Sequence, residues 1–123
     1  MGRKALIEEY FQAWLTQDRS CFDRVFGEAV RYSECYGPEY CGLQQVKRWF
    51  DDWNQLGRVL AWDIKHFWQV EETCVVEWFF QCDYQGNVDG FDGVSLVRFS
   101  PENKILSLQE FQSKAEHHFP YST

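Results

Sequence analysis

The chain of 123 residues lacks the features that mark several large classes of proteins. Only 12 Lys and Arg residues stand against 19 Asp and Glu, the formal net charge is −7, and no basic run occurs, which argues against nucleic acid as a partner. No apolar run approaches the ~20 residues of a membrane span. The N-terminus passes directly into an amphipathic pattern, which is not typical of a signal peptide. We therefore expect a cytoplasmic protein that binds neither nucleic acid nor membrane.

The sequence also has little that would build a metal or cofactor site. Its five cysteines are irregularly spaced and include no CxxC pair, and no HxH, HExxH or glycine-rich phosphate loop occurs. These cysteines are Cys21, Cys35, Cys41, Cys74 and Cys82. We expect reduced thiols packed as small apolar groups, with no metal and no cofactor.

Aromatic residues are abundant, at 19% of the chain: eleven Phe, six Trp and six Tyr. A fully enclosed Trp or Tyr side chain buries ~150–250 Å². A core of this size cannot enclose all of these rings, so the surplus is expected to line a cavity, an interface or both.

The hydrophobic periodicity predicts an α+β fold in a single domain covering residues 1–123, with a core over about 5–113 and a tail over 115–123. Ser20 and Asp23 are expected to cap a short helix that Gly27 ends. The other predicted elements are a helix over about 3–17, a strand over 30–36, a helix over about 43–56 closed by Gly57, and strands over 58–70, 73–85, 88–100 and 105–113. Short turns join the last four strands, which indicates an antiparallel meander.

The strand over 73–85 is apolar on both faces. Trp78 and Phe80 lie on one face, while Val75 and Phe79 lie on the other. A sheet covered by helices on one face normally shows polar residues on the other. We therefore expect a homodimer in which a second copy covers the outer face of the sheet.

Glu34 is the leading candidate for chemistry. It is spaced by two and four residues from Tyr32 and Val30, so in a strand it points to the same, apolar face as they do. A carboxyl group there is either desolvated, with a raised pKa suited to proton transfer, or it meets water where the strand twists out at its end. The residues alone leave both alternatives open.

Two further candidates carry hydroxyl groups. Ser95 follows Gly93 on the face of Phe91 and Phe99, where its small side chain either leaves space for a ligand or is satisfied within the core. Tyr10 lies on the buried stripe of the first helix, and its phenol either donates to a ligand oxyanion or pairs within the core.

The final strand carries the last polar candidates. In a strand, Glu110 and Gln112 point to the same face as Leu106 and Leu108, because these residues alternate at a spacing of two. They are expected either to line the mouth of a pocket or to be ordinary exposed residues.

Four segments, 28–34, 37–50, 93–99 and 104–111, resemble in order and spacing the nuclear transport factor 2-like superfamily, which includes SnoaL-like polyketide cyclases and ketosteroid isomerases. The resemblance spans about residues 5–113. It implies a cystatin-like cone with the order α-α-β-α-β-β-β-β, in which a curved antiparallel sheet wraps round the helices and a pocket opens at one end.

The resemblance also implies roles for single residues. The carboxylate base of the isomerases falls on Glu34 and their catalytic tyrosine on Tyr10. The second oxyanion donor falls on Ser95 and its supporting tyrosine on Phe50, and both positions depart from the isomerase pattern. The pocket walls fall on Tyr32, Trp78, Phe80, Leu108, Glu110 and Gln112. The polar groups on the last strand imply a more polar ligand than a steroid.

The sequence thus favours a SnoaL-like protein that binds a small apolar or aromatic molecule with a polar group inside the cone. Catalysis as a cofactor-independent isomerase, cyclase or lyase is one reading of that pocket. The alternatives are a non-catalytic ligand-binding protein, with walls from Trp14, Tyr32, Trp53 and Trp78, and a dimeric interaction domain with a filled cone.

Overall fold

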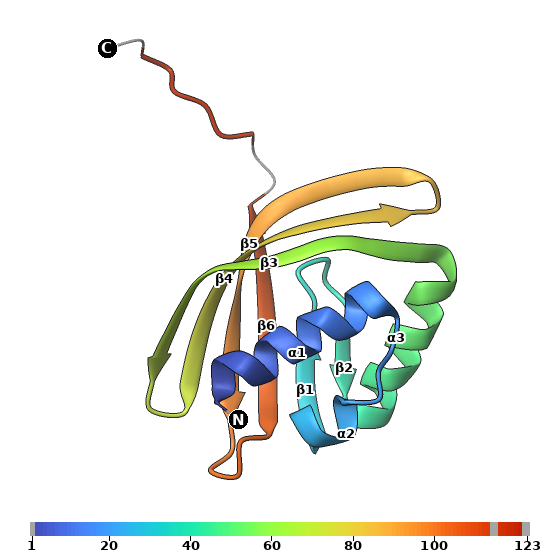
Figure 1. The fold of residues 1–123 in the computed structure, drawn as a ribbon, viewed down its shortest axis with the longest axis vertical. Coiled ribbons are helices and arrows are strands. Elements are labelled where there is room, and N and C mark those ends of the chain that lie inside the picture. The colour runs from blue at the N-terminus through green and yellow to red at the C-terminus, as the bar shows by residue number, and fades with distance from the viewer. Residues whose placement is uncertain (1, 114–115, 122–123) are drawn as a thin grey trace.

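The fold is described by a computed structural model covering residues 2–113 and 116–121. Three helices pack on a six-stranded curved sheet (Figure 1), so the α+β prediction is confirmed. The elements are α1 (Arg3–Thr16), α2 (Phe22–Val25), β1 (Phe26–Ser33), β2 (Glu39–Cys41), α3 (Leu43–Leu56), β3 (Gly57–Val70), β4 (Thr73–Tyr84), β5 (Asn87–Phe99) and β6 (Ile105–Ser113).

The sheet has the strand order β2-β1-β6-β5-β4-β3. Strands β3 to β6 form the predicted antiparallel meander. Strand β1 pairs with β6 in parallel and with β2 in an antiparallel hairpin. The parallel pairing was not predicted, because it joins two segments from opposite ends of the chain. It has a functional consequence, since it brings the end of β1 beside β6.

Helix α1 packs on the sheet, chiefly on β3, through aromatic and aliphatic side chains. Its buried residues recur at helical spacing, as the sequence predicts: Leu6, Ile7, Tyr10, Phe11, Ala13 and Trp14. The Phe11 ring stacks on Trp62 of β3 with centroids 3.8 Å apart, and Tyr10 packs edge-on against Phe26 at 5.0 Å. This part of the interior is therefore solid.

The region before α3 differs from the expectation in two places. Helix α2 begins at Phe22 after Cys21 and has no side-chain cap, so the predicted cap by Ser20 and Asp23 is wrong. The backbone N–H of Ser20 instead donates to Asp18 Oδ1 at 2.9 Å, a hydrogen bond that belongs to the turn before the helix.

The first strand lies earlier in the chain than the predicted 30–36. It ends at Ser33, and a tight turn follows, in which the Glu34 N–H donates to the Pro38 carbonyl at 3.0 Å. The chain then returns as β2, a strand that was not predicted. Gly42 ends this hairpin at φ 91°, a conformation that favours glycine, and α3 starts at the next residue.

The parity of the last strand also differs from the expectation. Ile105 is buried, whereas Leu106 points outward with 43% of its surface exposed. The pairing of β5 with β6 shifts register between Arg98 and Phe99, so a bulge breaks the alternation that placed Leu106 with Leu108. Leu108 is fully buried, so the inward face of β6 from that residue onward is as predicted.

In the described ranges no helix is long and apolar enough to cross a membrane. Of the predicted tail over 115–123, residues 115, 122 and 123 lie outside the described residues. Residues 116–121 form neither helix nor strand.

Candidate functional site

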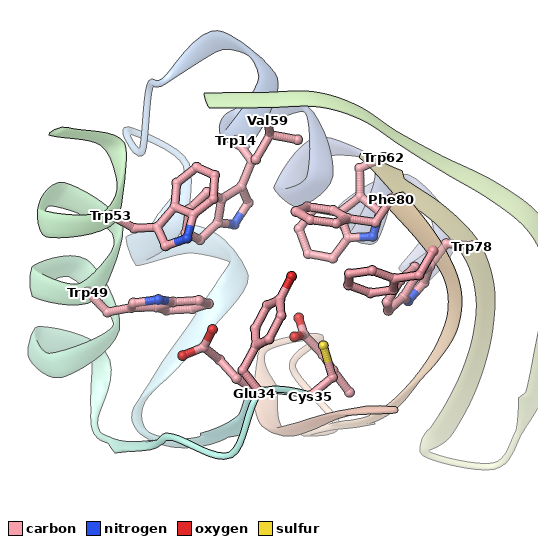
Figure 2. A pocket seen from close by; sticks show the side chains of 12 residues that line it. Trp14, Glu34, Cys35, Trp49, Trp53, Val59, Trp62, Trp78 and Phe80 are labelled. Carbon is pink, nitrogen blue, oxygen red and sulfur yellow. The ribbon is translucent and has the colours of Figure 1, made fainter. Parts of the chain in front are cut away.

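An aromatic cavity lies between α3, the inner face of the sheet and the turn after β1 (Figure 2). Trp49 and Trp53 of α3 face Trp62 of β3 and Trp78 of β4 across it, and Trp14 of α1 closes another side. Five of the six tryptophans of the chain therefore line one cavity, which is where much of the aromatic surplus lies. The other lining residues are Glu34, Cys35, Tyr36, Val59, Phe80, Phe91 and Glu110.

This inner cavity is narrow. Its volume is about 30 Å³ for the centres of water-sized spheres. A single water needs about 10–15 Å³ on this measure, so the cavity holds about two waters. Only a small group, such as a carbonyl, fits there without movement of the walls.

A wider vestibule of about 530 Å³ opens beside the inner cavity. The two spaces share Glu34, Tyr36, Trp49 and Trp53 as lining residues, so they lie next to each other. The remaining walls of the vestibule are Pro38, Tyr40, Asp52, Leu56, Cys82, Tyr84, Asn87 and Asp89. A ligand larger than a carbonyl group would place its remaining atoms in this vestibule.

Glu34 lies at the boundary of the two spaces. It is half-buried, and the phenol of Tyr40 donates a hydrogen bond to its Oε2 at 2.5 Å. Burial raises the pKa of the Glu34 carboxyl, and the hydrogen bond from Tyr40 partly opposes this rise. Of the two alternatives left open for Glu34, the structure shows the partly desolvated one.

Glu110 projects from β6 into the inner cavity and forms the second carboxyl of the site. Burial, with a smaller contribution from the charge of Glu34, raises its pKa to about 7. Hydrogen bonds from Tyr32 and from the Cys35 backbone act in the opposite direction. Glu110 is therefore a carboxyl group that exchanges its proton near neutral pH.

A chain of hydrogen bonds connects Glu110 to α1. The Tyr32 hydroxyl donates to Glu110 Oε2 at 2.5 Å, and the Tyr10 and Tyr32 hydroxyl oxygens are also 2.5 Å apart. Because the single hydroxyl proton of Tyr32 goes to Glu110, Tyr10 must be the donor to Tyr32. Both tyrosines are fully buried, and burial raises their pKa well above the usual tyrosine value. They are therefore neutral donors, and Tyr10 is connected to the cavity through Tyr32 and Glu110.

Neither carboxyl is neutralised by a basic side chain. Among the described residues no lysine, arginine or histidine lies within salt-bridge distance of Glu34 or Glu110. The described part of the chain also has no group of three or more His, Cys, Asp or Glu side chains placed to hold a metal ion.

Ser95 lies on the inner face of β5, but its hydroxyl is already used. It is fully buried and accepts a hydrogen bond from the indole N–H of Trp78 at 2.9 Å. The Trp78 ring lies across Gly93, where an added Cβ would come 2.3 Å from the Trp78 Cη2. The space that Gly93 leaves beside Ser95 is thus filled by Trp78, and Ser95 lines neither the inner cavity nor the vestibule.

The remaining candidates fall into two groups. Trp14, Trp53, Trp78 and Phe80 line the inner cavity together with Glu34 and Glu110. Tyr10, Tyr32, Leu108 and Gln112 line neither it nor the vestibule. Leu108 is buried in the core, and the Gln112 side chain donates to the Cys35 carbonyl at 3.2 Å, which ties β6 to the turn that carries Glu34.

Sequence reasoning missed several lining residues. Trp49 lies one helical turn before Trp53, so the i, i+4 spacing contained a signal for it. Trp62 is preceded by a register shift between Val59 and Ala61, which disturbs the simple alternation along β3. Tyr40 lies on β2, in a segment that the sequence did not indicate as a strand.

The chain belongs to the SnoaL-like domain family, whose sequence model matches residues 7–108. Comparison with curated proteins finds no match.

Solved structures share the fold at low sequence identity. A protein from Catenulispora acidiphila with a ketosteroid isomerase-like fold, solved in complex with trimethylamine, is 16% identical with a TM-score of 0.76, over 86% of this chain and 83% of that one. A protein from Pseudomonas putida assigned to the polyketide cyclases is 15% identical with a TM-score of 0.78, over 90% and 91%. An LEH-like epoxide hydrolase from M. tuberculosis is 10% identical with a TM-score of 0.79, over 90% and 82%. The cystatin-like, nuclear transport factor 2-like fold expected from the sequence is confirmed.

Proposed function

We propose that this protein is a small-molecule enzyme that transfers a proton next to a carbonyl group without a cofactor, as an isomerase, cyclase or lyase. One observation carries the proposal: Glu34 and Glu110, from two different elements, face the same aromatic cavity with raised pKa values and no basic partner among the described residues. Carboxyl groups in such surroundings are suited to general acid–base catalysis near neutral pH.

Glu34 is the proposed general base. It lies where the inner cavity meets the vestibule, so it is close to the α-carbon of a ligand whose carbonyl occupies the inner cavity. The ionised carboxylate takes a proton from that carbon, and the electron pair of the C–H bond moves into an enolate. In a ligand whose enolate is conjugated with a C=C bond, return of the proton to the far carbon completes an isomerisation. In a ligand with a second carbonyl group, the enolate carbon bonds to that carbonyl carbon, the C=O π pair moves to its oxygen, and the oxygen takes up the proton, which completes a cyclisation.

Glu110 is the proposed stabiliser of the enolate oxygen. With a pKa of about 7 it is protonated in a large part of the molecules at neutral pH, and a neutral carboxyl donates a hydrogen bond to an oxyanion. This assigns to Glu110 the donor role that the resemblance placed on Ser95, whose hydroxyl is paired with Trp78. Tyr32 and Tyr10 act as positioning residues, because their hydrogen bonds orient the Glu110 carboxyl.

The proposal is tested by exchange of α-hydrogens for deuterium. The neutral ketone 4,4-dimethylpentan-2-one has one small carbonyl end and a bulky tert-butyl end, which match the inner cavity and the vestibule. Its α-hydrogen signals are followed by proton NMR in D₂O with wild-type protein, Glu34→Gln and Glu110→Gln. Glu102→Gln, which changes an exposed turn residue, is the charge-matched control.

Wild type and Glu102→Gln are expected to accelerate exchange above buffer, and Glu34→Gln is expected to lose about 10²–10⁴-fold of that acceleration. Quenching of tryptophan fluorescence should show that Glu34→Gln still binds the ketone. Exchange at equal rates in wild type and Glu34→Gln would refute the base assignment.

A second candidate is a ligand-binding protein without catalysis. The observation that favours it is the small inner cavity, which gives a reacting carbonyl little freedom. In that case the ketone quenches tryptophan fluorescence, but α-hydrogen exchange stays at the rate in buffer.

We also propose a homodimer formed through the outer face of the sheet. Trp68 of β3, Leu96 of β5 and Phe111 of β6 are exposed by 52%, 37% and 53% although they are large and apolar. A Phe111→Lys/Leu96→Lys variant is expected to change a dimeric wild type into a monomer in multi-angle light scattering. A monomeric wild type would refute the proposal.

A further inference from the structure

We propose that the natural ligand is an organic cation, a carbonyl compound whose protonated or quaternary amine occupies the vestibule while its carbonyl end occupies the inner cavity. The inference deepens the proposed function, on which it rests for the position of the carbonyl end. The position of the charged group rests on the aromatic walls of the vestibule and on the carboxyl groups around both spaces.

The first support is the aromatic character of the vestibule. Its walls include the rings of Tyr36, Tyr40, Trp49, Trp53 and Tyr84. Tyr40 lies nearly parallel to Trp49 with centroids 4.7 Å apart, and Trp53 packs on Tyr84 at 5.4 Å, so two pairs of packed rings contribute to the walls. Ring faces attract ammonium groups electrostatically, and aromatic cages are a recurrent device for binding quaternary amines.

The second support is the sign of the charge around both spaces. Glu34, Asp52 and Asp89 line the vestibule and Glu110 lines the inner cavity, whereas no lysine, arginine or histidine among the described residues lines either space. Arg48 partly compensates Asp52, since its Nε lies 3.9 Å from Asp52 Oδ2 on the exposed surface of α3. The chain as a whole carries −7, so its field adds to the local potential.

These features together discriminate between ligand classes. An anionic ligand would meet four carboxyl groups, and among the described residues only Asp52 has a basic partner, Arg48 on the exposed surface of α3. A neutral ligand would displace water from those carboxylates without offering a positive charge in its place, so the lost hydration would not be compensated. A cation offsets that loss and gains the attraction of the rings, so it is the class that both observations favour.

The dimensions of the two spaces agree with this arrangement. The inner cavity accepts about two waters and therefore a carbonyl group, but not a branched ammonium group. The vestibule has about 530 Å³ and accepts a trimethylammonium group together with a short chain. Because Glu34, Trp49 and Trp53 line both spaces, a ligand with one or two carbons between its carbonyl and its nitrogen spans the boundary.

The test compares two ketones of nearly the same shape. Acetonyltrimethylammonium is the cation, and 4,4-dimethylpentan-2-one is its uncharged analogue, with carbon in place of nitrogen. Binding of each to the full chain is measured by titration calorimetry at low and high salt. We expect the cation to bind about tenfold or more tightly at low salt, with an advantage that shrinks as salt rises.

Variants locate the origin of the preference. Asp52→Asn/Asp89→Asn is expected to reduce the preference for the cation, while Glu28→Gln/Glu102→Gln, which removes two negative charges from exposed positions elsewhere, keeps it. Tyr84→Leu removes a ring face and should weaken cation binding, whereas Tyr84→Phe keeps the ring and should retain it. Circular dichroism verifies that each variant is folded.

Equal affinity for the two ketones would overturn the inference, as would the absence of binding by both at millimolar concentration. The outcome is distinguishable from that of the proposed catalysis, which is measured by α-hydrogen exchange. A preference for the cation without α-hydrogen exchange supports this inference and refutes the proposed catalysis. Exchange of the neutral ketone without a preference for the cation supports the catalysis and refutes this inference.

Discussion

Replacing Glu110 with glutamine gives the sharpest test of the electrostatics of this site. The side chain keeps its length, and the new amide oxygen is able to accept the hydrogen bond that Tyr32 donates at 2.5 Å. The substitution removes the ability to ionise and replaces one acceptor oxygen by an NH2 group, and only the loss of ionisation depends on pH. Its effect on stability should therefore depend on pH in a way that a structural defect would not.

The magnitude follows from the pKa of Glu110, which burial raises from the ordinary 4.5 to about 7. Between these values the native state holds a proton that the unfolded chain releases, so the free energy of unfolding falls as pH rises. Each tenfold change in proton affinity corresponds to about 1.4 kcal/mol, and the full change amounts to about 3 kcal/mol. This contribution is fully present below pH 4.5 and is lost as pH rises through about 7.

The assay is urea unfolding followed by tryptophan fluorescence, because five tryptophans report on the cavity itself. Unfolding is measured from pH 4 to pH 8 for wild type, Glu110→Gln and Glu102→Gln. The stability of Glu110→Gln relative to wild type should rise by about 3 kcal/mol across this range. Glu102→Gln, at an exposed turn, should follow the wild-type curve in parallel.

Parallel curves for wild type and Glu110→Gln would refute this reasoning. They would mean that Glu110 has the same proton affinity in the folded and unfolded states, and hence that the cavity does not desolvate it. The role of Glu110 as a neutral donor to an oxyanion would then lose its physical basis.

Three further substitutions test single contacts of the site. Tyr40→Phe removes the hydrogen bond that lowers the Glu34 pKa. A carbon NMR titration of the Glu34 carboxyl should therefore show a higher pKa than in wild type. An unchanged or lower pKa would contradict the role of Tyr40 as a donor to Glu34. Gly93→Ala places a Cβ 2.3 Å from the Trp78 Cη2 and 2.5 Å from the Phe111 carbonyl oxygen. We expect the free energy of unfolding, measured in urea, to fall by about 1–3 kcal/mol. A variant as stable as wild type would show that the Trp78 ring moves aside freely. Ser95→Ala leaves the buried Trp78 N–H without its acceptor, which should cost about 1–3 kcal/mol in the same assay, and a neutral result would show that water replaces the hydroxyl.

Local periodicity was enough to predict most of the elements. The alternation along residues 58–113 predicted four strands joined by short turns, and these are β3 to β6. The stripe from Leu6 to Trp14 predicted α1 and its buried face. Both patterns follow from the period of side-chain direction, 2 in a strand and 3.6 in a helix, which acts over a few residues.

Local periodicity failed where the backbone departs from regular geometry. The bulge that turns Leu106 outward and the tight turn that ends β1 at Ser33 both break the alternation. Neither feature has a strong signature in the residue types around it, since Leu106 is as apolar as its buried neighbour Ile105. Such breaks depend on pairing with another strand and are decided only when that strand is in place.

For the site, the sequence by itself determined which side chains were available: an excess of rings, a carboxyl at position 34 on an apolar stretch, and a carboxyl at position 110 on an apolar strand. The tertiary structure alone decided which of them meet. The parallel pairing of β1 with β6 brings Glu34 and Glu110 to one cavity, and the packing of Trp78 over Gly93 occupies Ser95. The physical reason is that a pKa depends on the desolvation and charges around the folded group, and those neighbours come from distant parts of the chain.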